Sequence, residues 1–92
     1  MAALTPDSIP RRRLDARVRN IGGVVTVGRL GRVVELSDSA LFVWQHVDGT
    51  RTVSALATCL AEAYQTPLDD SIVDDVIELL EQLIDAATVQ AG

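Results

Sequence analysis

Residues 67–86 carry apolar side chains on two adjacent helical stripes, and this feature constrains the fold more than any other. Both stripes repeat at intervals of three and four residues, which is the period of an α-helix. The first stripe consists of Ile72, Val76, Leu79 and Leu83, and the second of Val73, Ile77, Leu80 and Ile84. Their combined arc is about twice as wide as one packing contact needs, so the rest of the chain must cover both stripes or leave one open.

The chain is long enough for one compact domain, with 92 residues of which 48% are hydrophobic and 23% charged. This composition excludes intrinsic disorder, and no run approaches the ~18 consecutive apolar residues of a membrane span. The single cysteine, Cys59, excludes an internal disulfide framework and a multi-cysteine zinc site. We expect a cytoplasmic protein with no cofactor, no metal and no membrane partner.

Short runs rich in β-branched residues, separated by glycines, precede the helical part of the chain. The runs lie at residues 16–20, 24–27 and 32–36, and the breaks at 22–23 and 28–31. This spacing is typical of two tight hairpins in a three-stranded antiparallel sheet. In the last run Val34 and Leu36 share one face, whereas Val33 and Glu35 share the other. A sheet this small is not stable alone, so helices must cover one of its faces.

Three helices are expected after the strands. Ser37-Asp38 is expected to cap a helix that ends near Val47, and the next helix is expected to start near Thr52. For the third helix we predict Thr66 as N-cap and Pro67 at the first helical position, where a missing N–H costs nothing. The predicted fold is therefore an α+β domain, with a three-stranded antiparallel sheet followed by three helices.

The ends of the chain show no periodicity. Residues 1–13 contain two prolines and three consecutive arginines, which predicts a flexible basic arm. We expect a single domain over residues 14–88 and a flexible tail over residues 89–92.

Charge is distributed unevenly along the chain. Residues 1–51 hold all eight arginines and five acids, whereas residues 52–92 hold eight acids and no arginine or lysine. The third helix alone carries Asp69, Asp70, Asp74, Asp75, Glu78, Glu81 and Asp85. Duplex DNA binding depends on Lys or Arg at the phosphates, so this helix is excluded as a DNA-recognition element and only the arginine arm remains as an alternative. We predict no nucleic-acid partner, and the acidic face is suited to attract a basic surface of a partner enzyme.

Side chains suited to catalysis are scarce. The chain has one histidine, His46, one cysteine, and no glycine-rich phosphate loop, so neither a catalytic triad nor a metal cluster can be assembled. Ser71 follows Asp70 as in phosphopantetheine carriers, but too few residues follow it for the long helical stretch that those carriers have. The clustered carboxylates lack the spacing of a calcium loop. We predict a protein that is not an enzyme.

The doubled stripe leaves two interpretations open. Both stripes are core, or one is core and the other lines a groove beside a strand edge. An exposed edge next to an apolar helix flank accepts an extended peptide as an added strand. Three apolar anchors at ~1.5–3 kcal/mol each would leave an affinity near the micromolar range after the peptide's ordering cost.

Residues spread over about 17–86 form a pattern that is similar to that of a known family. The pattern comprises Val33-Val34-Glu35-Leu36, Trp44, Asp48-Gly49-Thr50-Arg51-Thr52-Val53, Leu56-Ala57, Leu60, Asp75-Val76, Leu79-Leu80 and Leu83. It resembles the PqqD-like family, the small peptide chaperones or precursor-peptide recognition elements of pathways that modify ribosomally synthesised peptides (RiPPs). The resemblance implies a winged-helix-like fold and no catalysis.

The same resemblance implies where a peptide binds and which proteins take part. The precursor's leader segment would add as a strand to the third strand and pack on the third helix. The implied peptide-binding residues are Arg32, Val33, Val34, Glu35, Leu36, Val73, Val76, Ile77, Leu80 and Ile84. The implied partners are the precursor peptide and a bacterial modifying enzyme, such as a radical SAM enzyme, a cyclase or a leader peptidase. A generic protein–protein adapter and a degenerate winged-helix regulator are the alternatives.

Overall fold

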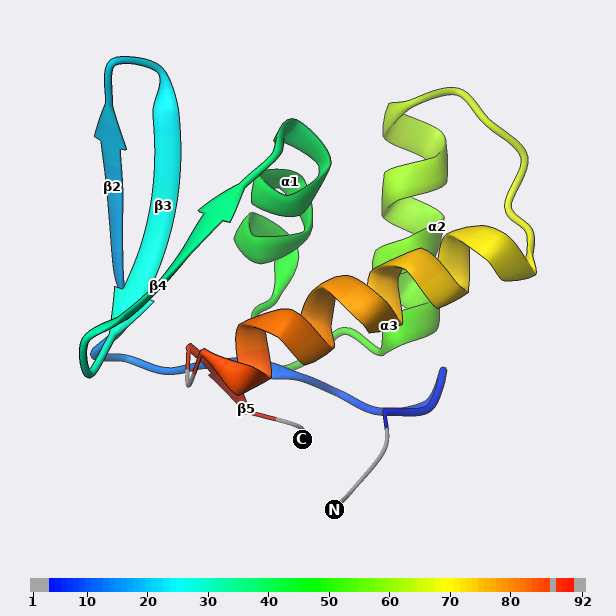
Figure 1. Cartoon of the computed structure of the whole chain (residues 1–92). Helices are drawn as coiled ribbons and strands as arrows, with labels where there is room; N and C mark the ends of the chain where they lie inside the picture. The colour runs from blue at the N-terminus through cyan, green and yellow to red at the C-terminus, as the bar shows by residue number, and fades with distance from the viewer. Residues whose placement is uncertain (1–3, 87, 91–92) are drawn as a thin grey trace.

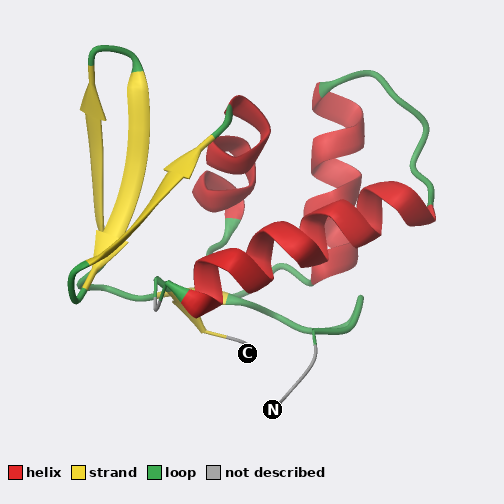
Figure 2. Ribbon diagram, in the orientation of Figure 1, coloured by secondary structure: helices red, strands yellow, loops and turns green. Residues whose placement is uncertain are grey.

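The computed structural model of the chain describes residues 4–86 and 88–90. Its elements are β1 (Arg11–Arg12), β2 (Arg17–Ile21), β3 (Val24–Arg29), β4 (Arg32–Leu36), α1 (Asp38–His46), α2 (Val53–Ala63), α3 (Asp70–Asp85) and β5 (Val89–Gln90). The sheet of β2, β3 and β4 forms one end of the molecule and the three helices the other (Figures 1 and 2). The predicted α+β fold, a three-stranded antiparallel sheet followed by three helices, is confirmed.

Two tight turns connect the strands of this sheet. Gly22, Gly23, Leu30 and Gly31 all have positive φ, as a type I′ hairpin turn requires at both of its central residues. The strand order is β2-β3-β4, with Val27 of β3 opposite Val18 and Val34. β3 is therefore paired on both sides, and β4 keeps one free edge.

The core lies between the inner face of the sheet and the helices. Its buried side chains include Val27, Leu36, Val43, Trp44, Leu56, Val76, Leu80 and Leu83. The buried residues of α3 come from both stripes, with Val76 and Leu83 from the first and Leu80 from the second. Neither stripe is therefore buried as a whole, and neither is exposed as a whole. The other stripe residues flank this buried line and are half-buried, with Ile72 and Leu79 on one side and Val73, Ile77 and Ile84 on the other. Within the described ranges, no helix is long and apolar enough to cross a membrane.

The start of α3 differs from the sequence prediction, and Thr66 as its N-cap was wrong. The N–H of Thr66 donates to the carbonyl of Ala61 at 2.9 Å, and the N–H of Gln65 donates to that of Glu62 at 3.2 Å. Gln65 has a φ of 53°, so this segment closes α2 as a Schellman motif. Asp69 caps α3 instead, because its carboxylate accepts from the N–H of Ile72 at 3.1 Å.

The segment predicted as a flexible basic arm is packed onto the domain over residues 4–13. Leu4 is buried in the core, and the carbonyls of Pro6 and Ser8 accept from the N–H groups of Ser54 and Val53. These bonds satisfy donors at the start of α2 that have no partner inside the helix. Residues 1–3 of the predicted arm lie outside the described residues.

The two ends of the chain also pair with each other. β1 and β5 form a two-stranded antiparallel sheet, with Arg11 opposite Gln90 and Arg12 opposite Val89. The N–H of Arg13 donates to the carbonyl of Thr88 at 2.9 Å. Residues 11–13 of the predicted arm are thus paired with residues 88–90 at the other end of the described chain, and residues 91–92 of the predicted tail lie outside the described residues.

Candidate functional site

The free edge of β4 is the first part of the candidate site. The turn that joins β3 to β4 directs the N–H of Arg32 towards β3, and strand alternation then directs those of Val33 and Glu35 towards the free edge. Val34 is half-buried and Leu36 is buried, so both side chains face the core, while Val33 and Glu35 are exposed. β4 can therefore accept a further strand without disturbing its own packing.

Arg32, for which the family resemblance implied a role in peptide binding, has a structural contact of its own. Its guanidinium donates to the backbone carbonyl of Asp85 at the C-terminus of α3. α3 has no basic residue in its last turn, so Arg32 supplies the positive charge that the negative end of the helix dipole favours. This contact ties the start of β4 to the end of α3, and from there the two elements diverge (Figure 1).

A hollow of about 320 Å³ lies past the C-terminal end of β4 and is the second part of the candidate site. Its lining residues are Ser39, Leu60, Tyr64, Thr66, Ile72, Asp75, Val76 and Leu79, which belong to α1, α2, α3 and the α2–α3 loop. Ser39 follows the last residue of β4 by three positions. The lining is mostly apolar and contains one charged side chain, Asp75, so the hollow suits a large apolar side chain with a polar group at its mouth.

The structure brings only some of the predicted helix residues to this hollow. Val76 lines it, but Val73, Ile77 and Ile84 do not. Leu80 is 0% exposed and belongs to the core, so its side chain cannot contact a peptide in this conformation. Ile72 and Leu79, which do line the hollow, were not among the implied peptide-binding residues. Helical periodicity defines the two flanks, but it contains no signal for which of them faces α1.

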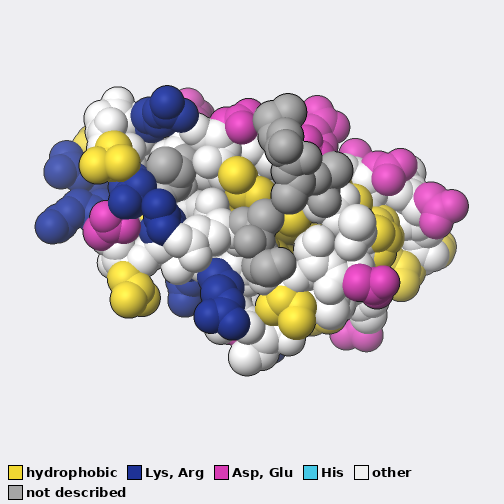
Figure 3. Space-filling view, turned by 90° about the horizontal axis from the view of Figure 1, so that it is seen from below, with side chains coloured by type: hydrophobic (Ala, Val, Ile, Leu, Met, Phe, Trp, Pro, Cys, Tyr) yellow, Lys and Arg dark blue, Asp and Glu magenta, His cyan; other side chains and the backbone are white. Residues whose placement is uncertain are grey.

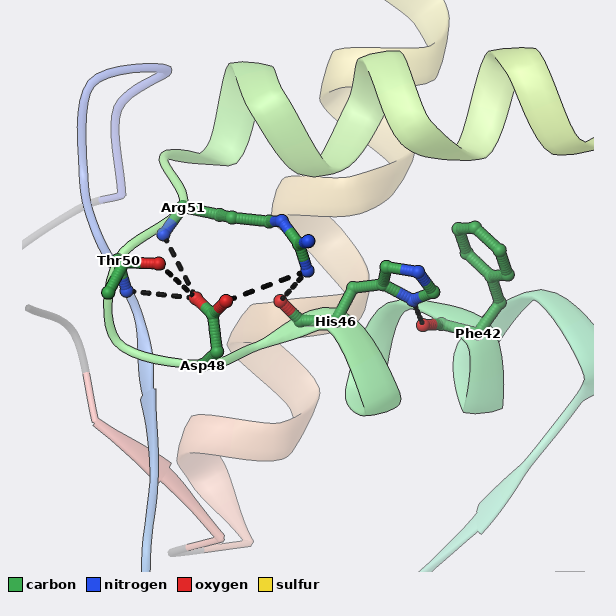
Figure 4. Close-up of polar contacts among 5 residues, drawn as sticks. All are labelled: Phe42, His46, Asp48, Thr50 and Arg51. Atoms are coloured by element: carbon green, nitrogen blue, oxygen red, sulfur yellow. Dashed lines mark hydrogen bonds and ion pairs between the residues drawn. The ribbon is translucent and has the colours of Figure 1, made fainter.

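The Asp48–Val53 stretch of the family pattern forms the turn between α1 and α2 (Figure 4). The Asp48 carboxylate accepts from the Thr50 hydroxyl at 2.8 Å, the Thr50 N–H at 2.9 Å and the Arg51 N–H at 3.2 Å. The Arg51 guanidinium donates to the carbonyl of His46 at 3.3 Å, and Gly49 has a φ of 80°. These residues fix the turn and do not line the hollow, so this part of the pattern is structural.

These hydrogen bonds predict how stability depends on pH. The Thr50 side-chain and backbone hydrogen bonds, with that of Arg51, lower the pKa of Asp48 from 3.8 to about 2. The unfolded chain therefore takes up the proton first, so the contribution of Asp48 is complete above pH ~4 and is lost as the pH falls through ~2. Asp48→Asn is expected to lower the free energy of unfolding at neutral pH and to make its decline in acid shallower.

Urea denaturation across the pH range from about 7 to about 2 measures this effect. The control is Asp74→Asn, which also removes one carboxylate from an exposed position, in this case on α3. Equal acid dependence in Asp48→Asn and the unmodified chain would contradict the role given to the turn.

Comparison with known proteins assigns the chain to a family. A family model described as coenzyme PQQ synthesis protein D (PqqD) matches residues 7–89. The chain belongs to the PqqD family. The resemblance to PqqD-like proteins that the sequence predicted is thus confirmed.

Two similar proteins link this family to peptide recognition. The "PqqA binding protein" of Azotobacter vinelandii (strain DJ / ATCC BAA-1303) is 41% identical over 49 residues, which cover 53% of this chain and 51% of that protein. The match therefore spans about half the length of this curated relative. The solution NMR structure of the PqqD truncation of Methylobacterium extorquens PqqCD superposes with a TM-score of 0.79 and 26% identity, over 96% of this chain and 95% of that one. That truncation is described as a functional, stand-alone RiPP recognition element.

Proposed function

We propose that this PqqD-family chain is a non-catalytic adapter that binds the leader segment of a ribosomally synthesised precursor peptide. The observation that carries the proposal is the free edge of β4, which leads towards the apolar hollow beside α3. Edge and hollow together offer the two elements of strand-addition recognition, namely backbone hydrogen bonds and a pocket for a side chain. The binding and recognition functions named for the two similar proteins support this role.

In the proposed complex the leader pairs with β4 and continues past Leu36. Its backbone bonds the outward N–H and C=O groups of Val33 and Glu35, and a large apolar side chain enters the hollow between Ile72 and Leu79. One or two such anchors at ~1.5–3 kcal/mol each, added to the backbone bonds, give an affinity in the micromolar range after ordering costs. The proposal thus keeps the predicted strand residues and moves the helix contacts from Val73, Ile77, Leu80 and Ile84 to the flank that lines the hollow.

The adapter role extends to a partner enzyme. The bound precursor is delivered to a bacterial, cytoplasmic modifying enzyme, such as a radical SAM enzyme, a cyclase or a leader peptidase. The chain performs this role as one winged-helix-like domain of residues 14–88, to which the packed N-terminal segment and β5 add the contacts described above.

Titration with a synthetic peptide of the A. vinelandii PqqA sequence tests the proposal, because the curated relative is a PqqA-binding protein. Backbone amide shifts are expected in β4 and around the hollow, at residues 32–36, 39, 60–66 and 72–79. Trp44 fluorescence gives an independent reading of the affinity. Shifts that avoid β4, or an affinity weaker than ~1 mM, would overturn the proposal.

A further inference from the structure

The outer face of the sheet points away from the helices, and none of the helices or strands that the structure describes covers it. β2 is exposed along its whole length, whereas the helices cover the face that carries Val27 and Leu36. Three large apolar side chains on or beside the outer face are strongly exposed, with Ile21 at 71%, Leu30 at 75% and Val33 at 68%. Exposed apolar groups gathered on one face indicate an interaction surface.

A hollow of about 460 Å³ lies on this face, over Gly28 of β3. Its lining includes the four arginines Arg17, Arg19, Arg29 and Arg32 and no carboxylate. A Cβ at position 28 would lie 2.9 Å from the Arg32 carbonyl oxygen and 3.2 Å from Cγ2 of Val33. Gly28 has no side chain to fill this part of the hollow, and such a glycine within a strand permits another chain to approach closely.

Two of these four arginines, Arg17 and Arg19, have no ion pair among the residues that the structure describes. In the part of the chain that the structure describes, the ion pairs are Arg29–Asp15 at 2.6 Å and Arg51–Asp48 at 3.6 Å. Arg17 and Arg19 therefore remain for an external partner. Seen from below, arginines gather at the sheet end of the molecule and most acids at the helical end (Figure 3).

We propose that this outer face docks an acidic amphipathic helix of the modifying enzyme, an inference that rests on the adapter role proposed above. A helix is a common cover for a sheet face that would otherwise remain exposed. Arginines beside exposed apolar side chains are also typical of protein interfaces. A leader strand added to β4 widens this sheet. Alternate side chains of the leader then lie on the outer face, beside the docked helix. The adapter can thus hold leader and enzyme on adjoining surfaces.

Two other occupants fit the surface less well. The acidic α3 of a second copy has its apolar line, Val76, Leu80 and Leu83, buried in its own core. Nucleic acid would use the arginines but would leave Ile21 and Leu30 without apolar contacts.

Designed helical peptides of about 18 residues, roughly five helical turns, test the inference with the full chain. The peptides share one leucine stripe and carry only Glu, only Gln or only Lys at the other positions. The Glu peptide is expected to bind most tightly and to shift amides of residues 17–33. Arg19→Glu is expected to weaken its binding by about tenfold, because a like charge then faces the peptide. The matched control Arg11→Glu changes the net charge equally but lies in β1, outside this hollow, and is expected to change affinity by less than about twofold.

The remaining outcomes separate the alternatives. Equal binding of the Gln or Lys peptide, tighter binding of a DNA duplex, or self-association that Arg19→Glu disrupts would each overturn the inference. Arg19→Glu is also titrated with the PqqA peptide and is expected to bind it like the unmodified chain. If the unmodified chain does not bind the PqqA peptide, the adapter role is contradicted. If it binds the PqqA peptide but not the Glu peptide, only the proposed docking surface is contradicted.

Discussion

Val33→Pro is expected to lower the affinity for the leader peptide by at least about tenfold while the chain remains folded. Proline removes the N–H that Val33 directs towards the free edge of β4, and its ring obstructs an incoming strand. Proline is tolerated on an edge strand where the missing N–H would face solvent, so the free energy of unfolding should fall by less than about 1.5 kcal/mol. Peptide titration by amide shifts and urea denaturation measure the two effects.

Two control variants isolate the backbone contribution. Val33→Thr keeps the N–H and the β-branched shape, so its affinity is expected to stay within about threefold of that of the unmodified chain. Val34→Pro removes a hydrogen bond to β3 and the half-buried Val34 side chain, so it is expected to cost roughly 2 kcal/mol or more. If Val33→Pro binds the peptide as tightly as Val33→Thr does, the leader does not add to β4.

Local signals in the sequence predicted most of the fold. Glycines at positions 22, 23 and 31 marked the hairpins because few other residues adopt positive φ there. Ser37 was predicted as a helix cap and Thr52 as the approximate start of the next helix, and the structure places both at N-cap positions. In each case the information lies within a few residues of the element that it determines.

The features that the sequence did not predict depend on contacts between distant segments. β1 and β5 have two residues each and no periodicity, so only their mutual pairing defines them as strands. Arg32 caps a helix that ends more than fifty residues later. At Thr66, two local motifs competed, and the Schellman closure of α2 prevailed over the start of α3. Proline at 67 is compatible with either motif, because it favours an extended conformation for the residue before it, which an N-cap residue also adopts.

The candidate site was partly predictable for the same reason. Alternation along residues 32–36 assigned Val34 and Leu36 to the inner face, because the period of a strand is two. The helical stripes were equally apolar, and the choice between them depends on where α1 and the end of α2 lie. A single sequence does not contain that arrangement, so the flank that lines the hollow had to come from the structure.

Leu79→Asn is expected to lower the affinity for the leader by about 10- to 100-fold, because it replaces a wall of the hollow where an apolar anchor of ~1.5–3 kcal/mol is proposed to bind. Leu79 is half-buried, so the chain should remain folded. Asparagine adds no charge beside Asp75, which lies one helical turn away. Any loss of affinity for the leader is therefore due to the missing apolar contact and not to charge repulsion.

Ile77→Asn is the matched variant on the opposite flank of α3. Ile77 is also half-buried but does not line the hollow, so its substitution is expected to change affinity by less than about threefold at a similar cost in stability. Leu80→Asn is expected to cost ~3–5 kcal/mol, enough to unfold a domain of this size, because it buries an amide in the core and leaves a cavity. Thermal unfolding and peptide titration of the three variants distinguish the two flanks. If Ile77→Asn abolished binding and Leu79→Asn did not, the leader would lie on the flank formed by Val73, Ile77 and Ile84, and the hollow would have another role.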